Sequence, residues 1–179
     1  APGGNYTTGS SYDTWTSSPA GMLAAMLALP DGVTYVVASS VTDRAGNLRV
    51  QNPLGSFIYD KTKPVAGIEV PAGGASYSSL GTINGTSVDN VGVSTVALII
   101  QDLGPGANGC YQPGFGFGQP CTLFPAQGAA CAGTSCAWSF TGINWQTNHQ
   151  YLVISSATDA AGNLQNSFAV GTASNSFVF

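Results

Sequence analysis

The stretch "SSVTDRAGNL" (residues 39–48) returns as "SSATDAAGNL" (155–164), with eight of ten positions identical at an offset of 116 residues. In each copy a run rich in β-branched and aromatic residues, "VTYVVASSV" (33–41) or "YLVISSA" (151–157), leads into a Thr-Asp-x-Ala-Gly-Asn turn. Such runs, bounded by Gly, Asn and Asp, are typical of β-strands that end in turns. The repeat therefore predicts the same strand and turn at two places in the chain.

The similarity extends outward from this stretch in both directions. "LPDGVTYVV" (29–37) occupies the place of "WQTNHQYLVI" (145–154), and "SFIYD" (56–60) matches "SFVF" (176–179). The period is about 120 residues. Periods of this length indicate tandem domains, because solenoid repeats are much shorter.

Aromatic residues recur with the same period. Trp15 in "TWTSS" matches Trp138 in "AWSFT", and both are predicted to be core residues. Tyr35 and Tyr151 stand where a strand begins, where a tyrosine can tie a loop to a sandwich edge. "SSPAGMLAAMLAL" (17–29) favours a helix by itself, but its place in the repeat overrides that interpretation.

The two copies are unequal in length. We expect residues 65–179 to form a complete β-sandwich module, residues 60–64 a linker, and residues 1–59 the later strands of a second module. An incomplete sandwich leaves a sheet edge and half a core exposed, and it should not be stable alone. Its missing strands would come from upstream sequence or from a neighbouring chain by strand addition.

Composition excludes several classes of protein. A net charge of −4 and only four Lys and Arg residues exclude nucleic-acid binding, which needs clustered basic side chains. Hydrophobic residues make up 44% of the chain, which excludes intrinsic disorder. The longest apolar run, "GMLAAMLALP" (21–30), is about half the length that a membrane crossing requires.

Four cysteines, Cys110, Cys121, Cys131 and Cys136, lie close together in the second copy. The single histidine, His149, makes a zinc cluster improbable, whereas two local disulfides fit an oxidising compartment. Three pairings exist for four cysteines. The short loops favour Cys110–Cys121 together with Cys131–Cys136.

Four segments together resemble a known family. They are the linker "DKTKP" (60–64), the turn "PAGGASYSSL" (71–80), the hairpin "GTSVDNVGV" (85–93) and the closing "TDAAGN" (158–163). This combination resembles the bacterial immunoglobulin-like (Big-type) tandem repeats of large surface proteins, adhesins and filaments. The resemblance implies an all-β, immunoglobulin-like sandwich of seven strands, with one complete module preceded by the C-terminal half of another. It does not extend to residues 1–12 or to an insertion at 103–135.

Catalytic patterns are not found in the sequence. A nucleophile triad needs a histidine, and His149 lies in a turn-like "TNHQ". Glu69 is the single glutamate, the seven aspartates follow turn patterns, and "GFGFG" (114–118) lacks the lysine of a phosphate-binding loop. We therefore expect a protein that is not an enzyme.

We expect no cofactor, and calcium is the alternative that the sequence offers. In an immunoglobulin-type sandwich, the loops "DNVGV" and "TDAAGN" lie at the end where the linker enters. Some members of the family bind calcium at such junctions. The candidate ligands, all of them hard oxygen donors, are Asp60, Asp89, Asn90, Asp159 and Asn163. Without calcium, these residues would form the turns by bonding their own backbone.

The insertion carries four aromatic residues among glycines and prolines: Tyr111, Phe115, Phe117 and Phe124. Aromatic side chains on a stapled loop are typical of contact surfaces, here for another subunit, a host protein or a glycan. They would equally serve to cover a flank of their own sandwich.

The sequence therefore predicts a non-catalytic structural module, located outside the cell or on its surface, that extends and connects repeats. Its expected partners are other copies of itself or neighbouring immunoglobulin-like modules. The alternative is an adhesin or carbohydrate-binding module that uses the aromatic insertion. A weaker one is an accessory domain of a secreted hydrolase.

Overall fold

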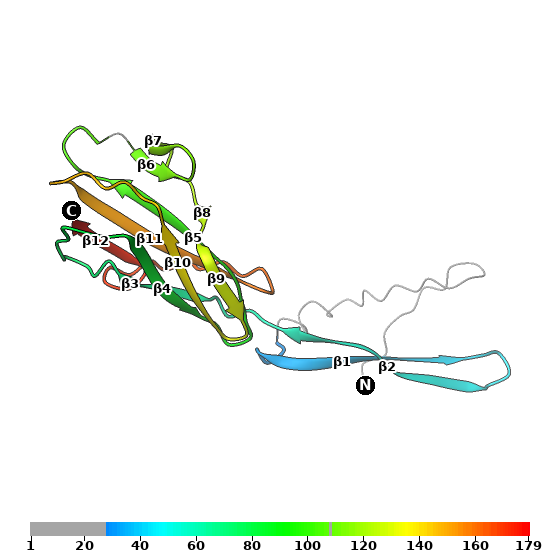
Figure 1. Cartoon of the computed structure of the whole chain (residues 1–179). Helices are drawn as coiled ribbons and strands as arrows, with labels where there is room; N and C mark the ends of the chain where they lie inside the picture. The colour runs from blue at the N-terminus through cyan, green and yellow to red at the C-terminus, as the bar shows by residue number, and fades with distance from the viewer. Residues whose placement is uncertain (1–27, 108) are drawn as a thin grey trace. The chain divides into compact units, whose positions relative to one another are not determined.

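A computed structural model of the chain describes residues 28–107 and 109–179. All regular elements in these ranges are β-strands, as the sequence predicted (Figure 1). The chain divides into two compact units, Ala1–Tyr59 and Asp60–Phe179. The predictions for Trp15 and for the segment 17–27 lie outside the described residues.

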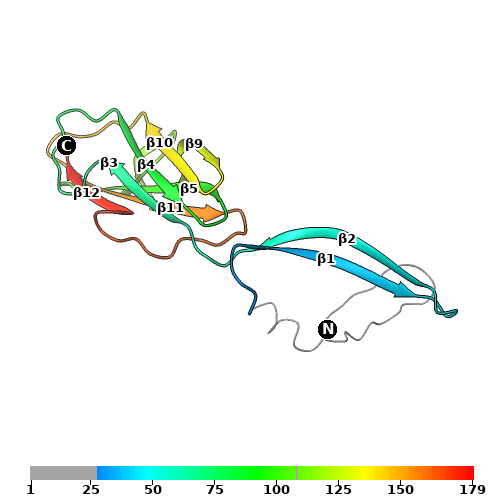
Figure 2. The ribbon, with the colours of Figure 1, turned by 90° about the horizontal axis from the view of Figure 1, so that it is seen from below.

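The first unit is described as a single antiparallel hairpin of β1 (Val33–Thr42) and β2 (Leu48–Tyr59). Figure 2 shows these strands as a long two-stranded ribbon. Pairing runs from Val33 opposite Tyr59 to Thr42 opposite Leu48, with one irregularity between Val37 and Ser39. The β-branched run of β1 and the Asp-Arg-Ala-Gly-Asn turn after it explain why the chain reverses here.

The second unit is a sandwich of two antiparallel sheets (Figure 1). In spatial order, one sheet consists of β3 (Val65–Val70), β4 (Thr82–Val88), β10 (Ser135–Thr141) and β9 (Gln127–Ala132). The other consists of β12 (Ser174–Val178), β11 (Gln150–Asp159), β5 (Val93–Asp102), β6 (Gly109–Gln112) and β7 (Gly116–Gln119), and β8 (Phe124–Pro125) pairs with β5. The described residues of this unit form ten strands where the resemblance implied seven, and four of the ten, β6, β7, β8 and β9, lie in the insertion.

The core of the sandwich follows from the alternation of buried and more exposed positions along most of its strands. In β10, Cys136, Trp138 and Phe140 point inward, and in β5 the buried positions include Leu98 and Ile100. Burying a large apolar side chain stabilises a fold by about 1.5–3 kcal/mol. The predicted core role of Trp138 is confirmed, since this side chain is 2% exposed.

The two units share their local structure as well as their sequence. Tyr35 stacks on Phe57 at a centroid distance of 5.6 Å and an interplanar angle of 28°, and Tyr151 stacks on Phe177 at 5.5 Å and 29°. In both units the two rings belong to directly opposed residues of the register. The hairpin β1–β2 is therefore the structural counterpart of the last two strands, β11 and β12.

Each of these tyrosines also ties down the loop five residues upstream. The Tyr35 hydroxyl donates to the carbonyl of Pro30 at 3.2 Å, whereas the Tyr151 hydroxyl accepts from the backbone N–H of Gln146 at 2.7 Å. The direction of the bond is reversed because proline has no N–H to donate. The predicted tyrosine ties are thus present in both copies.

The insertion is fastened by both of the disulfides that the short loops favoured. Cys110 in β6 is bonded to Cys121, and Cys131 in β9 is bonded to Cys136 directly opposite it in β10. The first bond closes the base of the β6–β7 hairpin, and the second links two neighbouring strands of one sheet.

Candidate functional site

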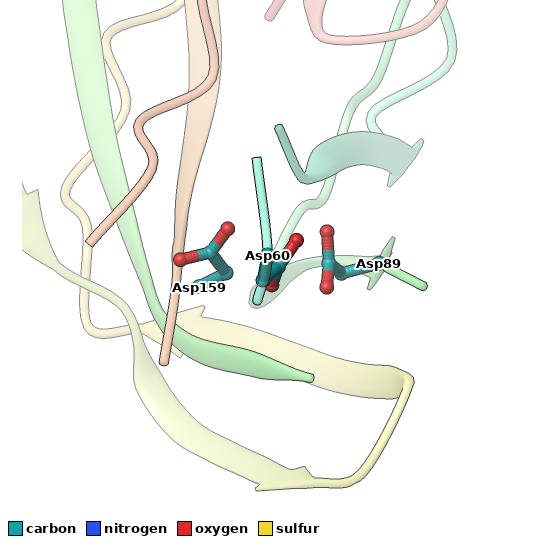
Figure 3. A group of neighbouring side chains, drawn as sticks. All are labelled: Asp60, Asp89 and Asp159. Atoms are coloured by element: carbon teal, nitrogen blue, oxygen red, sulfur yellow. The ribbon is translucent and has the colours of Figure 1, made fainter. Parts of the chain in front are cut away.

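Three aspartates meet at the end of the sandwich where the linker joins it (Figure 3). Asp60 opens the second unit, Asp89 follows β4, and Asp159 ends β11. Strands β4 and β11 belong to different sheets, so the sandwich itself brings their ends together. One carboxylate oxygen from each aspartate lies within 4.8 Å of the other two.

The carboxylate of Asp89 is incompletely hydrogen-bonded. Its side chain is buried, with 9% exposure, and Oδ2 accepts from the backbone N–H groups of Val91 at 2.8 Å and Gly92 at 2.9 Å. Its Oδ1 is buried and has no hydrogen-bond partner. A buried polar atom without a partner typically costs about 1–3 kcal/mol, and more when it carries charge. This oxygen therefore favours an additional ligand.

Asp159 combines the turn-forming role with membership of the cluster. Its Oδ1 accepts from the backbone N–H of Asn163 and its Oδ2 from the Asn163 side-chain amide, both at 2.8 Å. Asp43 makes the same two bonds to Asn47, also at 2.8 Å each. The turn-forming interpretation thus holds in both copies, while the structure places Asp159 beside two further carboxylates.

In the first copy this turn alters the acidity of Asp43. The Asn47 side-chain amide, followed by the Asn47 backbone N–H, stabilises the carboxylate and lowers the pKa of Asp43 below its ordinary value of 3.8. The carboxylate is therefore ionised throughout the neutral range. In the first copy the decapeptide thus provides an ionised, hydrogen-bonded aspartate as well as a turn.

The two asparagines proposed as ligands are placed differently from the aspartates. Asn163 directs its amide nitrogen to Asp159 and, at 3.2 Å, to the backbone carbonyl of Asp60. It therefore holds the linker against the β11 loop. Asn90 is exposed in the loop after β4.

The insertion aromatics divide into a covering group and one exposed ring. Tyr111 and Phe124 are buried and pack on Phe140 at centroid distances of 5.8 Å and 5.1 Å. Phe117 is partly buried and lies 5.3 Å from Tyr151. Phe115, by contrast, is 79% exposed. Three of the four rings thus cover a flank of their own sandwich, and Phe115 is available for contact.

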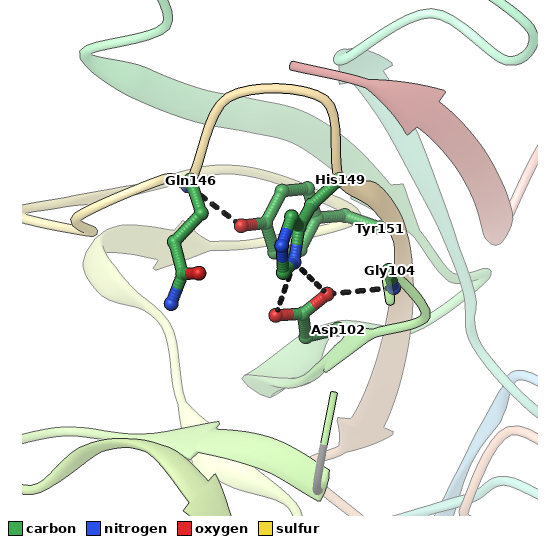
Figure 4. A network of polar contacts seen from close by, with 5 residues as sticks. All are labelled: Asp102, Gly104, Gln146, His149 and Tyr151. Atoms are coloured by element: carbon green, nitrogen blue, oxygen red, sulfur yellow. Dashed lines mark hydrogen bonds and ion pairs between the residues drawn. The ribbon is translucent and has the colours of Figure 1, made fainter. Parts of the chain in front are cut away.

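A polar network that the sequence did not reveal joins β5 to the loop before β11 (Figure 4). His149 Nδ1 lies 2.9 Å from both carboxylate oxygens of Asp102, and the Gly104 backbone N–H donates to the same carboxylate. Burial, and then the Asp102 charge, raise the pKa of Tyr151 above its ordinary value of 10.0. The aspartate concerned, Asp102, ends a strand and is therefore visible in the sequence. Its position opposite Tyr151 becomes known only from the register of β5 and β11.

The residues of this network support the structure of the loop that precedes β11. It consists of Asp102, Gly104, Gln146, His149 and Tyr151, and none of these carries the hydroxyl or thiol of a serine, threonine or cysteine nucleophile. Both the His149 and the Asp102 side chains are mostly buried. The geometry thus supports a role in fixing the loop that precedes β11.

Comparison with known protein families and with curated proteins finds no match to this chain. Within residues 28–107 and 109–179, no helix has the length and apolar character needed to span a membrane. The two disulfides are compatible with an oxidising, extracellular environment.

Proposed function

We propose that the chain is a non-catalytic structural part of an extracellular bacterial surface protein or fibre, and that it extends and connects immunoglobulin-like modules. The observation that carries this proposal is the hairpin β1–β2. It repeats the closing strands β11 and β12, yet Val37 and Phe57, whose equivalents are core residues in the sandwich, are exposed in the hairpin.

The difference in exposure between equivalent positions is large. Val37 and Phe57 are 40% and 41% exposed, whereas the corresponding Val153 and Phe177 are 0% and 1% exposed. In the sandwich, β5 pairs along the second edge of β11, from Tyr151 opposite Asp102 onward. The hairpin therefore has the shape and chemistry of half a module that accepts a strand of the β5 type.

The occupant is a complementary half-module, from a neighbouring module or from another copy of the chain. Strand addition would satisfy the edge N–H and C=O groups of β1. Each apolar side chain that it covered would add about 1.5–3 kcal/mol. Assembly of this kind links successive modules without any catalytic chemistry.

Calcium fits this proposal at the start of the complete module. Asp60, Asp89 and Asp159 would hold the ion, because hard cations take carboxylate oxygens and Asp89 Oδ1 has no hydrogen-bond partner. The bound ion would neutralise the repulsion among the three carboxylates. It would also fasten the linker to the sandwich and so stiffen the connection between modules.

Sedimentation velocity across a concentration series tests the assembly. Val37 occupies a core-facing position, and its neighbour Val36, 61% exposed, lies on the opposite face. We expect the wild-type chain to associate with increasing concentration and Val37→Lys to abolish this association. The matched control Val36→Lys adds the same charge one residue away and should associate like the wild type.

A chain that stays monomeric at every concentration would contradict the proposal. Equal association of the two lysine variants would contradict it as well, because the core face would then not be the interface.

A further inference from the structure

A hollow of about 600 Å³ lies between the turn of the β6–β7 hairpin and the loop at 142–146. Phe115 and Phe117 line it on the hairpin side, and Asn144 and Gln146 line it on the loop side. We propose that this hollow binds a neutral saccharide. The inference does not depend on the assembly of the β1–β2 hairpin.

The aromatic side of the hollow suits the apolar face of a sugar ring. The face of a phenyl ring carries partial negative charge, so the polarised C–H groups of a pyranose pack well against it. The Phe117 ring packs against the rings of Tyr151 and Trp145, at centroid distances of 5.3 Å and 6.2 Å, and these contacts hold it in a fixed position. Phe115 is 79% exposed and contributes little to the core of the protein.

The opposite side of the hollow suits sugar hydroxyls. A primary amide offers two N–H donors and a carbonyl acceptor, and a hydroxyl group both donates and accepts. Asn144 and Gln146 present two such amides, and both residues are exposed. The backbone of Gln146 is fixed by its hydrogen bond to the Tyr151 hydroxyl.

Charge distinguishes a neutral saccharide from other ligands. All the residues that line the hollow are uncharged aromatic, amide or glycine residues. An acidic sugar or a phosphate would find no basic side chain there to pair with. A neutral ligand carries no charge that needs a partner, and it can contact both the aromatic side and the amide side of the hollow.

The hollow is open and well supported. Its volume lies within the range of about 300–1,000 Å³ that is common for small-molecule sites. Gly116 and Gly142 keep the rim low, since both have positive φ and a side chain in either place would project into open space. The Cys110–Cys121 bond closes the base of the hairpin, which reduces the ordering cost of binding.

An NMR titration of the full chain tests the proposal. The probes are the hexaoses of cellulose, chitin, xylan, mannan and amylose, each added at millimolar concentration. We expect at least one of them to shift the amide resonances of residues 112–117 and 142–146. Phe115→Ala and Asn144→Ala should each weaken that binding about tenfold.

The control variant is Val170→Ala, which truncates another exposed apolar side chain, 88% exposed and absent from the hollow. It should bind like the wild type. Either of two results would overturn the proposal: no shift with any hexaose, or shifts that survive Phe115→Ala unchanged.

Discussion

A single substitution in the acidic cluster, Asp159→Asn, removes one negative charge and should thereby increase the stability of the folded state when no cation is bound. With no cation bound, two carboxylate oxygens 4.8 Å apart, the upper limit of their separation in the cluster, repel by about 3.5 kcal/mol at an effective dielectric constant of about 20. The substitution removes the repulsion of Asp159 with both Asp60 and Asp89. Salt reduces this gain, and the neutral side chain bonds Asn163 more weakly. We expect the variant to be more stable than the wild type in EDTA by about 1–3 kcal/mol.

Calcium should act in the opposite direction by stabilising the wild type. An ion at one hundred times its dissociation constant stabilises the folded state by about 2.7 kcal/mol. For a unit of this size each kcal/mol moves the melting temperature by roughly 4 °C, so the wild type should gain about 10 °C. The Asp159→Asn variant should show little change. Thermal unfolding followed by the fluorescence of Trp138 and Trp145, in EDTA and in calcium, measures both effects.

Asp43→Asn is the matched control for this experiment. Asp43 makes the same turn bonds as Asp159 but does not belong to the cluster. This variant should therefore keep the full calcium response. If the wild type melts at the same temperature in EDTA and in calcium, the reasoning about the site is refuted. If Asp43→Asn also loses the response, the assignment to the cluster is refuted.

Two further predictions concern the sandwich itself. Gly85→Ala should destabilise it by about 3 kcal/mol or more in urea unfolding, because the added methyl would collide with the Gly67 carbonyl and the Trp138 ring. Gly81→Ala, which projects into open space, should change stability by less than about 0.5 kcal/mol, and equal effects would contradict this account. The folded state raises the pKa of Tyr151 above 10.0. The contribution of Tyr151 to the stability of the fold is therefore complete below pH 10.0 and is lost as the pH rises through the higher pKa of the folded state. Urea unfolding at increasing pH should show this alkaline loss in the wild type and a smaller one in Tyr151→Phe, and identical profiles would contradict it.

The features that the sequence predicted well depend on local patterns or on the repeat. The strands around the two decapeptides follow from their β-branched runs, and the turns follow from Asp and Asn bonding their own backbone. The convergence of Asp60, Asp89 and Asp159 was predicted because a sandwich places those loops at one end. Short spacing was enough to predict both disulfides.

The features that it predicted poorly depend on contacts between distant segments. Strands β6, β7 and β8 are short and rich in glycine and proline, so their pairing with one another and with β5 is set by tertiary contacts. The burial of Tyr111 depends on meeting Phe140 in the opposite sheet. The pairing of His149 with Asp102 depends on register across two strands.

The segment that follows β3 gives the second unit a mechanical property. Residues 74–77 pair with β12 in parallel, through hydrogen bonds from Gly74 to Ser176, from Tyr77 to Val178 and from Val178 to Ala75. Tension applied to the two ends of the unit would pull these neighbouring segments in opposite directions along their length. The bonds would then bear the load together in shear, and would not open one after another as in a peeled hairpin. The sandwich is thus arranged to resist stretching along the direction of the chain.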